Sequence, residues 1–281
     1  MLAGTLRIST RNARYQQWSA LLGNRNKRLR SQRFLVQGVR PLNIALARKW
    51  PLEALLYAGD RNLSRWAENV LDQAGAGVQR ASLTSDLLNE LGGKEESSPE
   101  LIAVAIMPPD RLDRLQSGDD ALNVVFDRPT MPGNIGTLLR SVDAFGGRGL
   151  VVSGHAADPY DPQAVRASTG SMFAVPVVRV PSPDPVREWT ARARKQGVPL
   201  RVIGSDEHGD NDLDGTDLTG PVLLIVGNET AGMSAAWRDL CDQIVRIPIG
   251  GTSSSLNAAA AGTVLLYEAA RQRGFPARGQ P

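Results

Sequence analysis

The sequence is poor in the residue types on which several common kinds of site depend. Among 281 residues it has one cysteine, Cys241, and two histidines, His155 and His208. A single cysteine forms no disulfide within the chain, and the Cys/His cluster of a zinc site is missing. The two histidines lie far apart in segments typical of loops. The sequence therefore predicts no metal site and no Ser-His-Asp hydrolase.

Long apolar runs are also missing. No run approaches the roughly 18 residues that a membrane helix needs. The N-terminal stretch MLAGTLRISTRNARYQQW lacks the uninterrupted apolar core of a signal peptide. We therefore expect a soluble, cytoplasmic protein without a membrane partner, long enough for two domains.

Lysine is scarce, although the chain has a formal net charge of +3 and a pI of about 9.3. Most of its cations are arginines, which bind phosphate through two parallel hydrogen bonds; a GC-rich codon composition is the alternative explanation. Residues 7–33 are rich in cations, contain no acid and include Tyr15 and Trp18. We predict a basic arm that binds RNA phosphates and stacks on bases, the alternative being a solvated helix face with Trp18 in the core. The predicted RNA contacts are Arg7, Arg11, Arg28, Arg30 and Arg33.

Short β-type runs alternate with helical patterns along the chain. A polar, proline-bearing segment at 108–120 has the composition of a linker, so we expect one α/β domain at 1–115 and a second at 116–281. The second half alternates more clearly, which predicts a parallel sheet covered on both faces, with ligands bound at the carboxyl ends of its strands. Its expected strands lie at 122–126, 149–153, 175–180, 199–205, 221–227 and 243–249.

The first of three notable loops follows the run at 122–126. Asn134 is expected to cap a helix that Gly146 and Gly147 end. Gly136 lies one turn before Arg140, so we expect an open surface through which a substrate reaches the arginine. An ordinary capped helix with a surface arginine is the alternative.

The other two loops are LLIVGNETAGMS and IPIGGTSSSLN. The first nearly matches a P-loop, but Met233 stands in place of the lysine, which argues against hydrolysis of a nucleoside triphosphate. Glu229 remains to bind a cation or a hydroxyl. In the second, two glycines permit a sharp turn, and the serines at 253–255 are expected to cap the next helix. The small residues at 258–262 allow another backbone to pack closely.

Taken in order, NIGTLLR, IVGNETAGM and IPIGGTSSSLN resemble the three signature motifs of the SpoU/TrmH-type RNA 2'-O-ribose methyltransferases of the SPOUT superfamily. FLVQGVR and the basic segment before it resemble the N-terminal domain, related to ribosomal protein L30e, of the ribosomal RNA members, although Gln37 stands where an acid is common. The resemblance covers nearly the whole chain. It implies an α/β domain with a deep trefoil knot, S-adenosylmethionine as cofactor, and a homodimer formed through the knot.

The activity that the resemblance implies is 2'-O-methylation of RNA, above all 23S ribosomal RNA, with antibiotic self-resistance as an extension. A silent RNA-binding protein that keeps the fold, or a tRNA methyltransferase, is the alternative. By motif match the cofactor would lie against Gly204, Gly227, Asn228, Ile247, Ile249 and Leu256. The catalytic and substrate-side positions would be Asn134, Arg140, Glu229, Ser255 and Asn257. Whether Arg140 is a general base or a phosphate clamp stays open, because a guanidinium normally keeps its proton.

Overall fold

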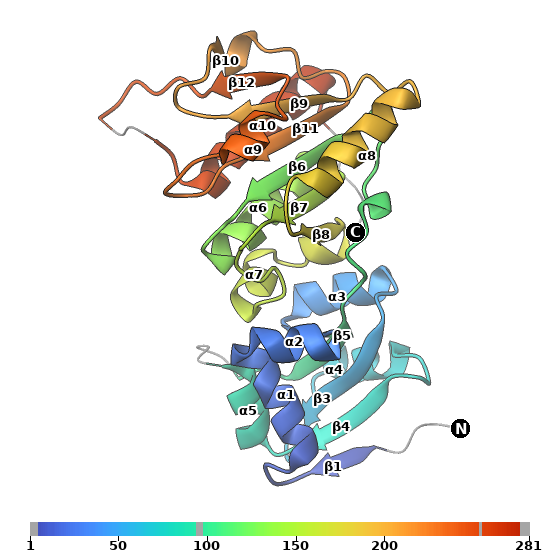
Figure 1. Cartoon of the computed structure of the whole chain (residues 1–281). Helices are drawn as coiled ribbons and strands as arrows, with labels where there is room; N and C mark the ends of the chain where they lie inside the picture. The colour runs from blue at the N-terminus through green and yellow to red at the C-terminus, as the bar shows by residue number, and fades with distance from the viewer. Residues whose placement is uncertain (1–4, 94–97, 253–254, 276–281) are drawn as a thin grey trace. The chain divides into compact units, whose positions relative to one another are not determined.

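A computed structural model describes residues 5–93, 98–252 and 255–275 of the chain (Figure 1). The chain forms two compact units. The first unit comprises Met1–Pro108 with Tyr160–Phe173, and the second comprises Pro109–Pro159 with Ala174–Pro281. The division thus falls after Pro108, whereas the functional boundary near residue 115 stays a prediction.

The first unit contains a five-stranded mixed sheet in the order β1-β4-β3-β5-β2. β5 runs antiparallel to both of its neighbours, while β4 runs parallel to β1 and β3. Three of these strands, β2, β3 and β5, contain the β-type runs at 34–36, 54–57 and 101–106, whereas β1 and β4 are short or largely polar. The strands are β1 Leu6–Ile8, β2 Arg33–Gln37, β3 Leu52–Ala58, β4 Gln79–Leu83 and β5 Leu101–Ile106.

The basic segment at 7–33 is folded into this unit. Asn12 caps α1 by accepting a hydrogen bond from the Tyr15 backbone N–H, and Asn24 caps α2 in the same way. Tyr15 and Trp18 are buried among the leucines of α5, so neither ring is exposed for stacking on bases. The core alternative is therefore correct for Trp18, and Tyr15 is buried as well. The helices are α1 Ala13–Gly23, α2 Arg25–Ser31, α3 Val39–Ala47, α4 Arg65–Gln73 and α5 Ser85–Gly92.

A later segment, Tyr160–Phe173, completes the first unit and contains α7 (Pro162–Ala167) and a 3₁₀ turn (Ser171–Phe173). Phe34 on β2 lies 4.9 Å from the Tyr160 ring and 6.4 Å from the Phe173 ring, centroid to centroid. Trp50 meets Phe173 edge-on at 5.1 Å. Aromatic packing thus holds this segment against the first sheet.

The second unit contains a seven-stranded sheet in the order β10-β12-β9-β11-β6-β7-β8, and every pairing in it is parallel. The predicted parallel sheet is confirmed. Its six longer strands coincide with the six predicted runs, although β12 ends at Arg246. The strands are β6 Leu122–Asp127, β7 Gly149–Ser153, β8 Val177–Val180, β9 Arg201–Ser205, β10 Asn211–Asp212, β11 Val222–Val226 and β12 Gln243–Arg246.

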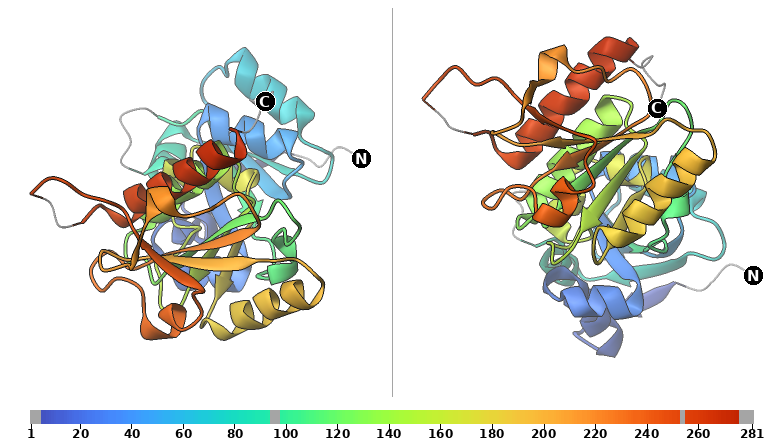
Figure 2. Two further views of the ribbon diagram at one scale, coloured as in Figure 1. Left: turned by 90° about the horizontal axis from the view of Figure 1, so that it is seen from above. Right: turned by 45° about the horizontal axis from the view of Figure 1, so that its top comes forward.

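Helices cover both faces of this sheet, with α10 and α8 on opposite sides (Figure 2). One face packs against α8, α9 and Leu115, so the expected linker joins the core of the second unit. The other face carries α6 and α10 in mutual contact: a Cβ on Gly262 would lie 2.5 Å from Leu138, and the Ser141 and Thr263 hydroxyls are 2.7 Å apart. The small residues at 258–262 therefore let α10 approach α6. These helices are α6 Pro132–Ala144, α8 Asp184–Lys195, α9 Ala235–Arg238 and α10 Ala258–Arg273.

Candidate functional site

A cavity of about 670 Å³ opens at the carboxyl edge of the second unit's sheet. Its walls come from the loops after β9, β11 and β12 and from the start of α10. Two of the three motif loops therefore meet here, as parallel-sheet geometry predicts. The predicted site residues that line it are Gly227, Asn228, Glu229, Ile247, Ile249, Ser255 and Leu256.

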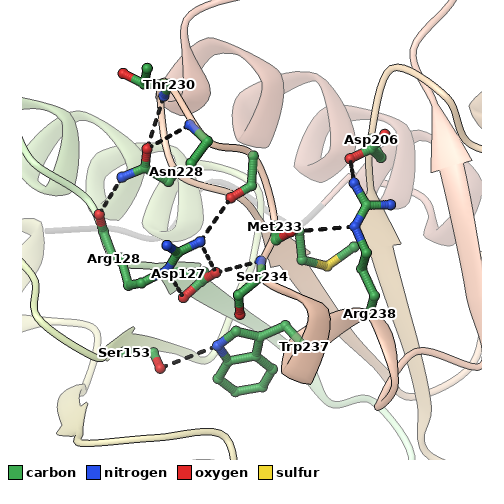
Figure 3. A network of polar contacts seen from close by, with 12 residues as sticks. Asp127, Arg128, Ser153, Asp206, Asn228, Thr230, Met233, Ser234, Trp237 and Arg238 are labelled. Carbon is green, nitrogen blue, oxygen red and sulfur yellow. Dashed lines mark hydrogen bonds and ion pairs between the residues drawn. The ribbon is translucent and has the colours of Figure 1, made fainter.

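The loop after β11 is held in shape by its neighbour after β6 (Figure 3). The buried Asp127 carboxylate accepts hydrogen bonds from the Ser234 backbone N–H at 2.9 Å and from the Arg128 side chain at 3.0 Å. Arg128 also donates to the Gly232 carbonyl at 3.2 Å. The Asp127 carboxylate is buried, so it would be costly to leave it without these hydrogen bonds. The turn is therefore preorganised before any ligand binds.

Asn228 closes the same turn. Its Nδ2 donates to the Arg128 carbonyl at 2.6 Å, and its Oδ1 accepts from the backbone N–H groups of Thr230 and Ala231, both at 2.9 Å. A Cβ on Gly227 would lie 2.4 Å from the Met233 backbone nitrogen, so only glycine fits there. The hydrogen bonds of the Asn228 side chain thus stabilise the loop, and Asn228 also lines the cavity.

The Glu229 carboxylate is the centre of a second network at the cavity. Its Oε1 accepts from Asn134 Nδ2 at 2.8 Å, and its Oε2 accepts from the Thr130 backbone N–H and hydroxyl, each at 3.1 Å. Asn257 Nδ2 donates in turn to Asn134 Oδ1 at 3.3 Å. Partial burial alone would raise the pKa of Glu229, but the hydrogen bonds from Asn134 and Thr130 outweigh it and lower the pKa below its usual value.

Two predicted helix caps are wrong, and the residues concerned take part in the site. Asn134 does not cap α6, which begins at Pro132 without a side-chain cap; its amide is turned to Glu229 instead. The cap of α10 is Asn257, whose Oδ1 accepts from Ala259 N–H at 3.0 Å. Ser255 lines the cavity, while residues 253 and 254 lie outside the described residues. Gly146 and Gly147 end α6 as predicted.

Two site residues of the sequence prediction lie away from the cavity. Arg140 is exposed on α6 and is not part of the cavity wall. Gly136 is buried, so the open surface expected beside the arginine is not there. Gly204, on β9, packs against Met233 and Cys241, where a Cβ would come within 2.6 and 2.7 Å of their side chains. Gly204 thus leaves room for the Met233 and Cys241 side chains and is not itself part of the cavity wall.

The sequence reasoning missed three carboxylates that line the cavity, Asp206, Glu207 and Asp212. Asp206 forms an ion pair with Arg238, and Asp212 forms one with Arg246 at 2.6 Å. Glu207 is exposed, and its Oε1 lies 3.6 Å from His208 Nε2. The signal was present: an acidic run directly follows a parallel strand, at the edge where ligands of such sheets bind.

The predicted RNA contacts fall into different environments. Arg28 is 2% exposed, donates to the Leu21 carbonyl at 2.7 Å and forms an ion pair with Asp161 at 3.1 Å, so its place in the RNA surface is corrected: it is an interior residue. Arg11 pairs with Glu90, and Arg33 pairs with Glu53 at 2.6 Å. Arg7 and Arg30 are exposed.

Within 5–93, 98–252 and 255–275, His, Cys, Asp and Glu side chains form no group of three or more suited to a metal ion. Over the same ranges, no helix has both the length and the apolar character needed to cross a membrane.

The fold and the site define a class of α/β protein in which motif loops surround a preformed cavity at the carboxyl edge of a parallel sheet. The SpoU rRNA Methylase family matches residues 121–267, and the SpoU L30e-like domain matches residues 12–103. The chain belongs to the SpoU rRNA methylase family.

Particular relatives span nearly the whole chain. A 23S rRNA (uridine(2479)-2'-O)-methyltransferase of Streptomyces viridochromogenes is 56% identical over 95% of this chain and 92% of its own length. The crystal structure of the SpoU methyltransferase AviRb from the same organism, in complex with AdoMet, has a TM-score of 0.90 at 56% identity, covering 94% of this chain and 98% of that one. An AdoMet-bound rRNA methyltransferase from Sinorhizobium meliloti has a TM-score of 0.85 at 25% identity, covering 95% and 98%.

Proposed function

We propose that this protein transfers a methyl group from S-adenosylmethionine to the 2'-hydroxyl of a nucleotide in 23S ribosomal RNA. The nucleotide is the uridine that corresponds to the target of the Streptomyces viridochromogenes relative, which is 56% identical. The observation that carries the proposal is the preformed cavity, where the Glu229–Asn134 network meets the motif loops in one place.

The cavity fits the cofactor in size and chemistry. A volume of about 670 Å³ suits a molecule of nucleoside size. Ile249 and Leu256 line it although they are 39% and 41% exposed, and they supply apolar surface for a purine. Glu207, which is exposed at the cavity, would supply negative charge for the positive groups of the cofactor. When bound, the cofactor supplies an electrophilic methyl group.

The residues around Glu229 orient the acceptor. Transfer to a ribose hydroxyl is an in-line displacement, so the 2'-hydroxyl must be aligned and must lose its proton. The lowered pKa keeps the Glu229 carboxylate ionised at neutral pH. It therefore fixes the Asn134 amide and holds an acceptor toward a hydroxyl, whereas a weak base of this kind is poorly suited to remove the proton itself.

Arg140 acts as a phosphate clamp in this proposal, and a second copy of the chain brings it to the site. It is exposed on α6 and outside its own cavity wall. Tyr267 and Phe275, 47% and 53% exposed, lie 5.5 Å apart beside Phe145, so the α6–α10 face carries an aromatic cluster in need of a cover. A homodimer through this face would bury the cluster and complete two sites.

The division of labour follows the two matched domains. In the proposal, residues 1–115 supply RNA affinity and residues 116–281 bind the cofactor and perform the chemistry, with the trefoil knot that is typical of the superfamily. The protein works in the cytoplasm, where ribosomal RNA is found.

Mapping of 2'-O-methyl groups tests the activity. Protein-free 23S ribosomal RNA from a strain that lacks the enzyme is incubated with the protein and S-adenosylmethionine, and alkali-resistant positions are mapped. One new methylated uridine is expected in 23S RNA and none in a tRNA pool. Methylation of tRNA alone would show that the substrate is tRNA and not 23S RNA. No methylation of either RNA would favour the alternative of a catalytically silent RNA-binding protein.

Resistance is a separate outcome of the same activity. Expression in a host that lacks the modification, followed by growth on a panel of antibiotics that bind the large ribosomal subunit, tests it. A raised inhibitory concentration that requires Glu229 would support self-resistance, and unchanged inhibition across the panel would limit the protein to housekeeping modification.

A further inference from the structure

Two arginines hold successive carbonyl groups of the loop after β11. Arg128, which follows β6, donates to the Gly232 carbonyl at 3.2 Å. Arg238, the last residue of α9, donates to the Met233 carbonyl at 3.3 Å. Figure 3 shows the two arginines on opposite sides of Met233. The loop is therefore held from both sides at consecutive residues.

An aspartate fixes each of these arginines. Asp127 is buried and accepts from two nitrogens of Arg128, at 3.0 and 3.1 Å. The Asp206 side chain is 8% exposed and forms an ion pair with Arg238. A guanidinium can join a carboxylate to a carbonyl because its N–H donors lie in a rigid plane, whereas a lysine ammonium is a point charge. Each arginine thus forms a bridge, Asp127–Arg128 or Asp206–Arg238, from an aspartate to a carbonyl of the loop.

The Asp127–Arg128 bridge lies next to the residues that orient the acceptor. The Arg128 carbonyl accepts from Asn228 Nδ2 at 2.6 Å, and Asn228 directly precedes Glu229. The Thr130 hydroxyl, from the same loop as Arg128, donates to Glu229 at 3.1 Å. Arg128 itself has a φ of 49°, in the left-handed region that a residue other than glycine rarely occupies. Such a conformation persists where the surrounding structure imposes it, and it is common at functional sites.

The Asp206–Arg238 bridge lies at the cavity wall. Asp206 lines the cavity, whereas Arg238 is not among the lining residues. The Asp206 backbone N–H donates to the Val245 carbonyl of β12 at 2.9 Å, and its Oδ1 accepts from the His208 N–H at 3.0 Å. The bridge therefore connects β12 and the loop after β9 to the loop after β11, so a displacement of Arg238 would change the shape of the wall.

A loop that is fixed in advance favours both binding and transfer. Two backbone hydrogen bonds close the turn of this loop, since Asn228 and Gly232 donate to each other's carbonyls at 3.0 and 3.1 Å. Ordering a loop when a ligand binds costs affinity, and the two bridges reduce that cost. In-line transfer also requires close alignment, because a misplacement of about 1 Å can cost about a hundredfold in rate.

We propose that Arg128 and Arg238 are positioning residues for methyl transfer. Arg128 fixes the loop where Glu229 orients the acceptor, and Arg238 fixes it where the cavity binds the cofactor. Neither arginine is among the lining residues of the cavity, so both act through the groups that they hold. The inference rests on the proposed function, because it takes the cavity as the S-adenosylmethionine site.

Arg194 offers a matched control at the opposite edge of the same sheet. It forms an ion pair with Asp242 and donates to the Leu200 carbonyl at 2.9 Å, so it too joins a carboxylate to a carbonyl. Leu200 and Asp242 directly precede β9 and β12, at the amino ends of these strands. The exposed fractions of the three arginine side chains are similar, 40% for Arg194, 36% for Arg128 and 39% for Arg238. Arg194→Ala therefore removes an equivalent bridge away from the cavity.

Hydrogen exchange of the cofactor-free protein tests the bridges themselves. Arg128→Ala and Arg238→Ala should each raise the exchange rate of the backbone N–H groups at 227–234 about tenfold, because the closed turn loses a charged hydrogen bond. Arg194→Ala should leave that segment near wild type. Exchange at 227–234 that is unchanged in both bridge variants, or that rises equally in the control, would overturn the proposal.

Calorimetry of cofactor binding tests Arg238 without any methyl transfer. Arg238→Ala should weaken binding of S-adenosylmethionine about tenfold, and Arg128→Ala should weaken it by less than about threefold. Arg238→Lys separates geometry from charge, because it keeps a cation beside Asp206 and loses the planar fork. It should lose most of the same affinity, and wild-type affinity in the lysine variant would overturn the bridge as the cause.

Steady-state methylation separates the roles of the two arginines. Arg128→Ala should lower kcat about tenfold or more and leave KM for S-adenosylmethionine near wild type, whereas Arg238→Ala should mainly raise that KM. Arg128→Lys, which keeps a cation beside the buried Asp127, takes its place if the alanine variant does not fold. The opposite pattern, or equal changes in Arg194→Ala, would overturn the assignment.

The same measurements separate this inference from the proposed activity. If the wild type methylates RNA and both bridge variants match it in exchange, affinity and rate, the inference fails alone. If the wild type methylates no RNA, but exchange at 227–234 and cofactor affinity still depend on the two arginines, the proposed activity fails alone.

Discussion

The arginines between residues 7 and 33 have the same charge but different environments. Arg28 is interior, Arg11 pairs with Glu90, and Arg30 remains exposed. Their carboxylate partners are distant in sequence. The positive charge of residues 7–33, which include no acid, is therefore partly neutralised in the folded unit. The cations of this segment that stay exposed include Lys27 and Arg30 of α2.

Arg28 and Arg30 should therefore respond differently to the same substitution. Arg28→Gln should lower the free energy of unfolding by about 2 kcal/mol, because it breaks a buried ion pair and frees two carbonyls. Arg30→Gln should change it by less than about 0.5 kcal/mol. Urea unfolding measures both, and an Arg28→Gln protein as stable as wild type would contradict the interior role.

Glu229 should make stability depend on pH. Its pKa is lowered in the folded state, so its stabilising contribution is present above the unfolded-state pKa and is lost as pH falls through the folded-state value. Wild type should therefore lose more stability between neutral and acidic pH than Glu229→Gln, which has no titrating group there. Urea unfolding across that range tests this, and parallel pH profiles for the two proteins would contradict it.

At the scale of elements, α10 depends on a residue that also serves the site. Asn257 caps the helix through Oδ1 and contacts Asn134 through Nδ2. The helix can lie against α6 because Gly262 leaves room for Leu138. Helix start and site geometry are thus coupled through one side chain.

Two substitutions of Asn257 should separate these roles. Asn257→Ala should cost about 1 kcal/mol of stability through loss of the cap. Asn257→Asp keeps a capping oxygen, so stability should stay near wild type, but it removes the donor to Asn134 and should lower kcat about tenfold or more. Thermal unfolding and single-turnover methylation measure the two effects, and an Asn257→Asp enzyme with full activity would remove the amide from the site.

At the scale of the whole molecule, the two units are interleaved along the chain rather than consecutive. Tyr160–Phe173 leaves the second unit's sequence to pack on the first, and Leu115 of the expected linker packs in the second core. A cut near residue 120 would therefore remove Leu115 from the core of the second unit. It would also separate Tyr160 and Phe173 from Phe34 of the first unit and so expose their rings.

Fragments of the second unit should show this. A fragment from Pro109 should unfold at a higher temperature than one from Ala121, because it keeps Leu115, which is buried in the core. Both should bind S-adenosylmethionine in calorimetry with similar affinity if cofactor binding needs only residues 116–281. Folded fragments that do not bind it would contradict the proposed division of labour.

The homodimer should appear in complementation between two inactive variants. Arg140→Ala should abolish methyl transfer and keep cofactor affinity, whereas Leu256→Asp should lose cofactor binding, because a carboxylate would be buried against the purine. Mixed dimers contain one site with both wild-type residues only if Arg140 acts across the interface. Regained activity on mixing is expected. Two variants that stay inactive together, or a monomer in sedimentation at micromolar concentration, would contradict this arrangement.

The sequence by itself determined the features that depend on near neighbours. Alternating apolar runs predicted the parallel sheet of the second unit, and the motif order indicated the family and most of the cavity wall. Hydrophobic periodicity and glycine turns are local, so they can be recognised within a short window. The motif loops meet because all strands point their carboxyl ends to one edge.

Only the tertiary structure decided which polar groups are paired. It turned Asn134 from a helix cap into a partner of Glu229, placed Asp206 and Glu207 in the cavity wall, buried Arg28 against Asp161 and left Lys27 and Arg30 exposed. These pairings join residues tens of positions apart. A hydrogen bond or ion pair forms with whichever group the packed elements bring within about 3 Å, and no local pattern in the sequence encodes that distance.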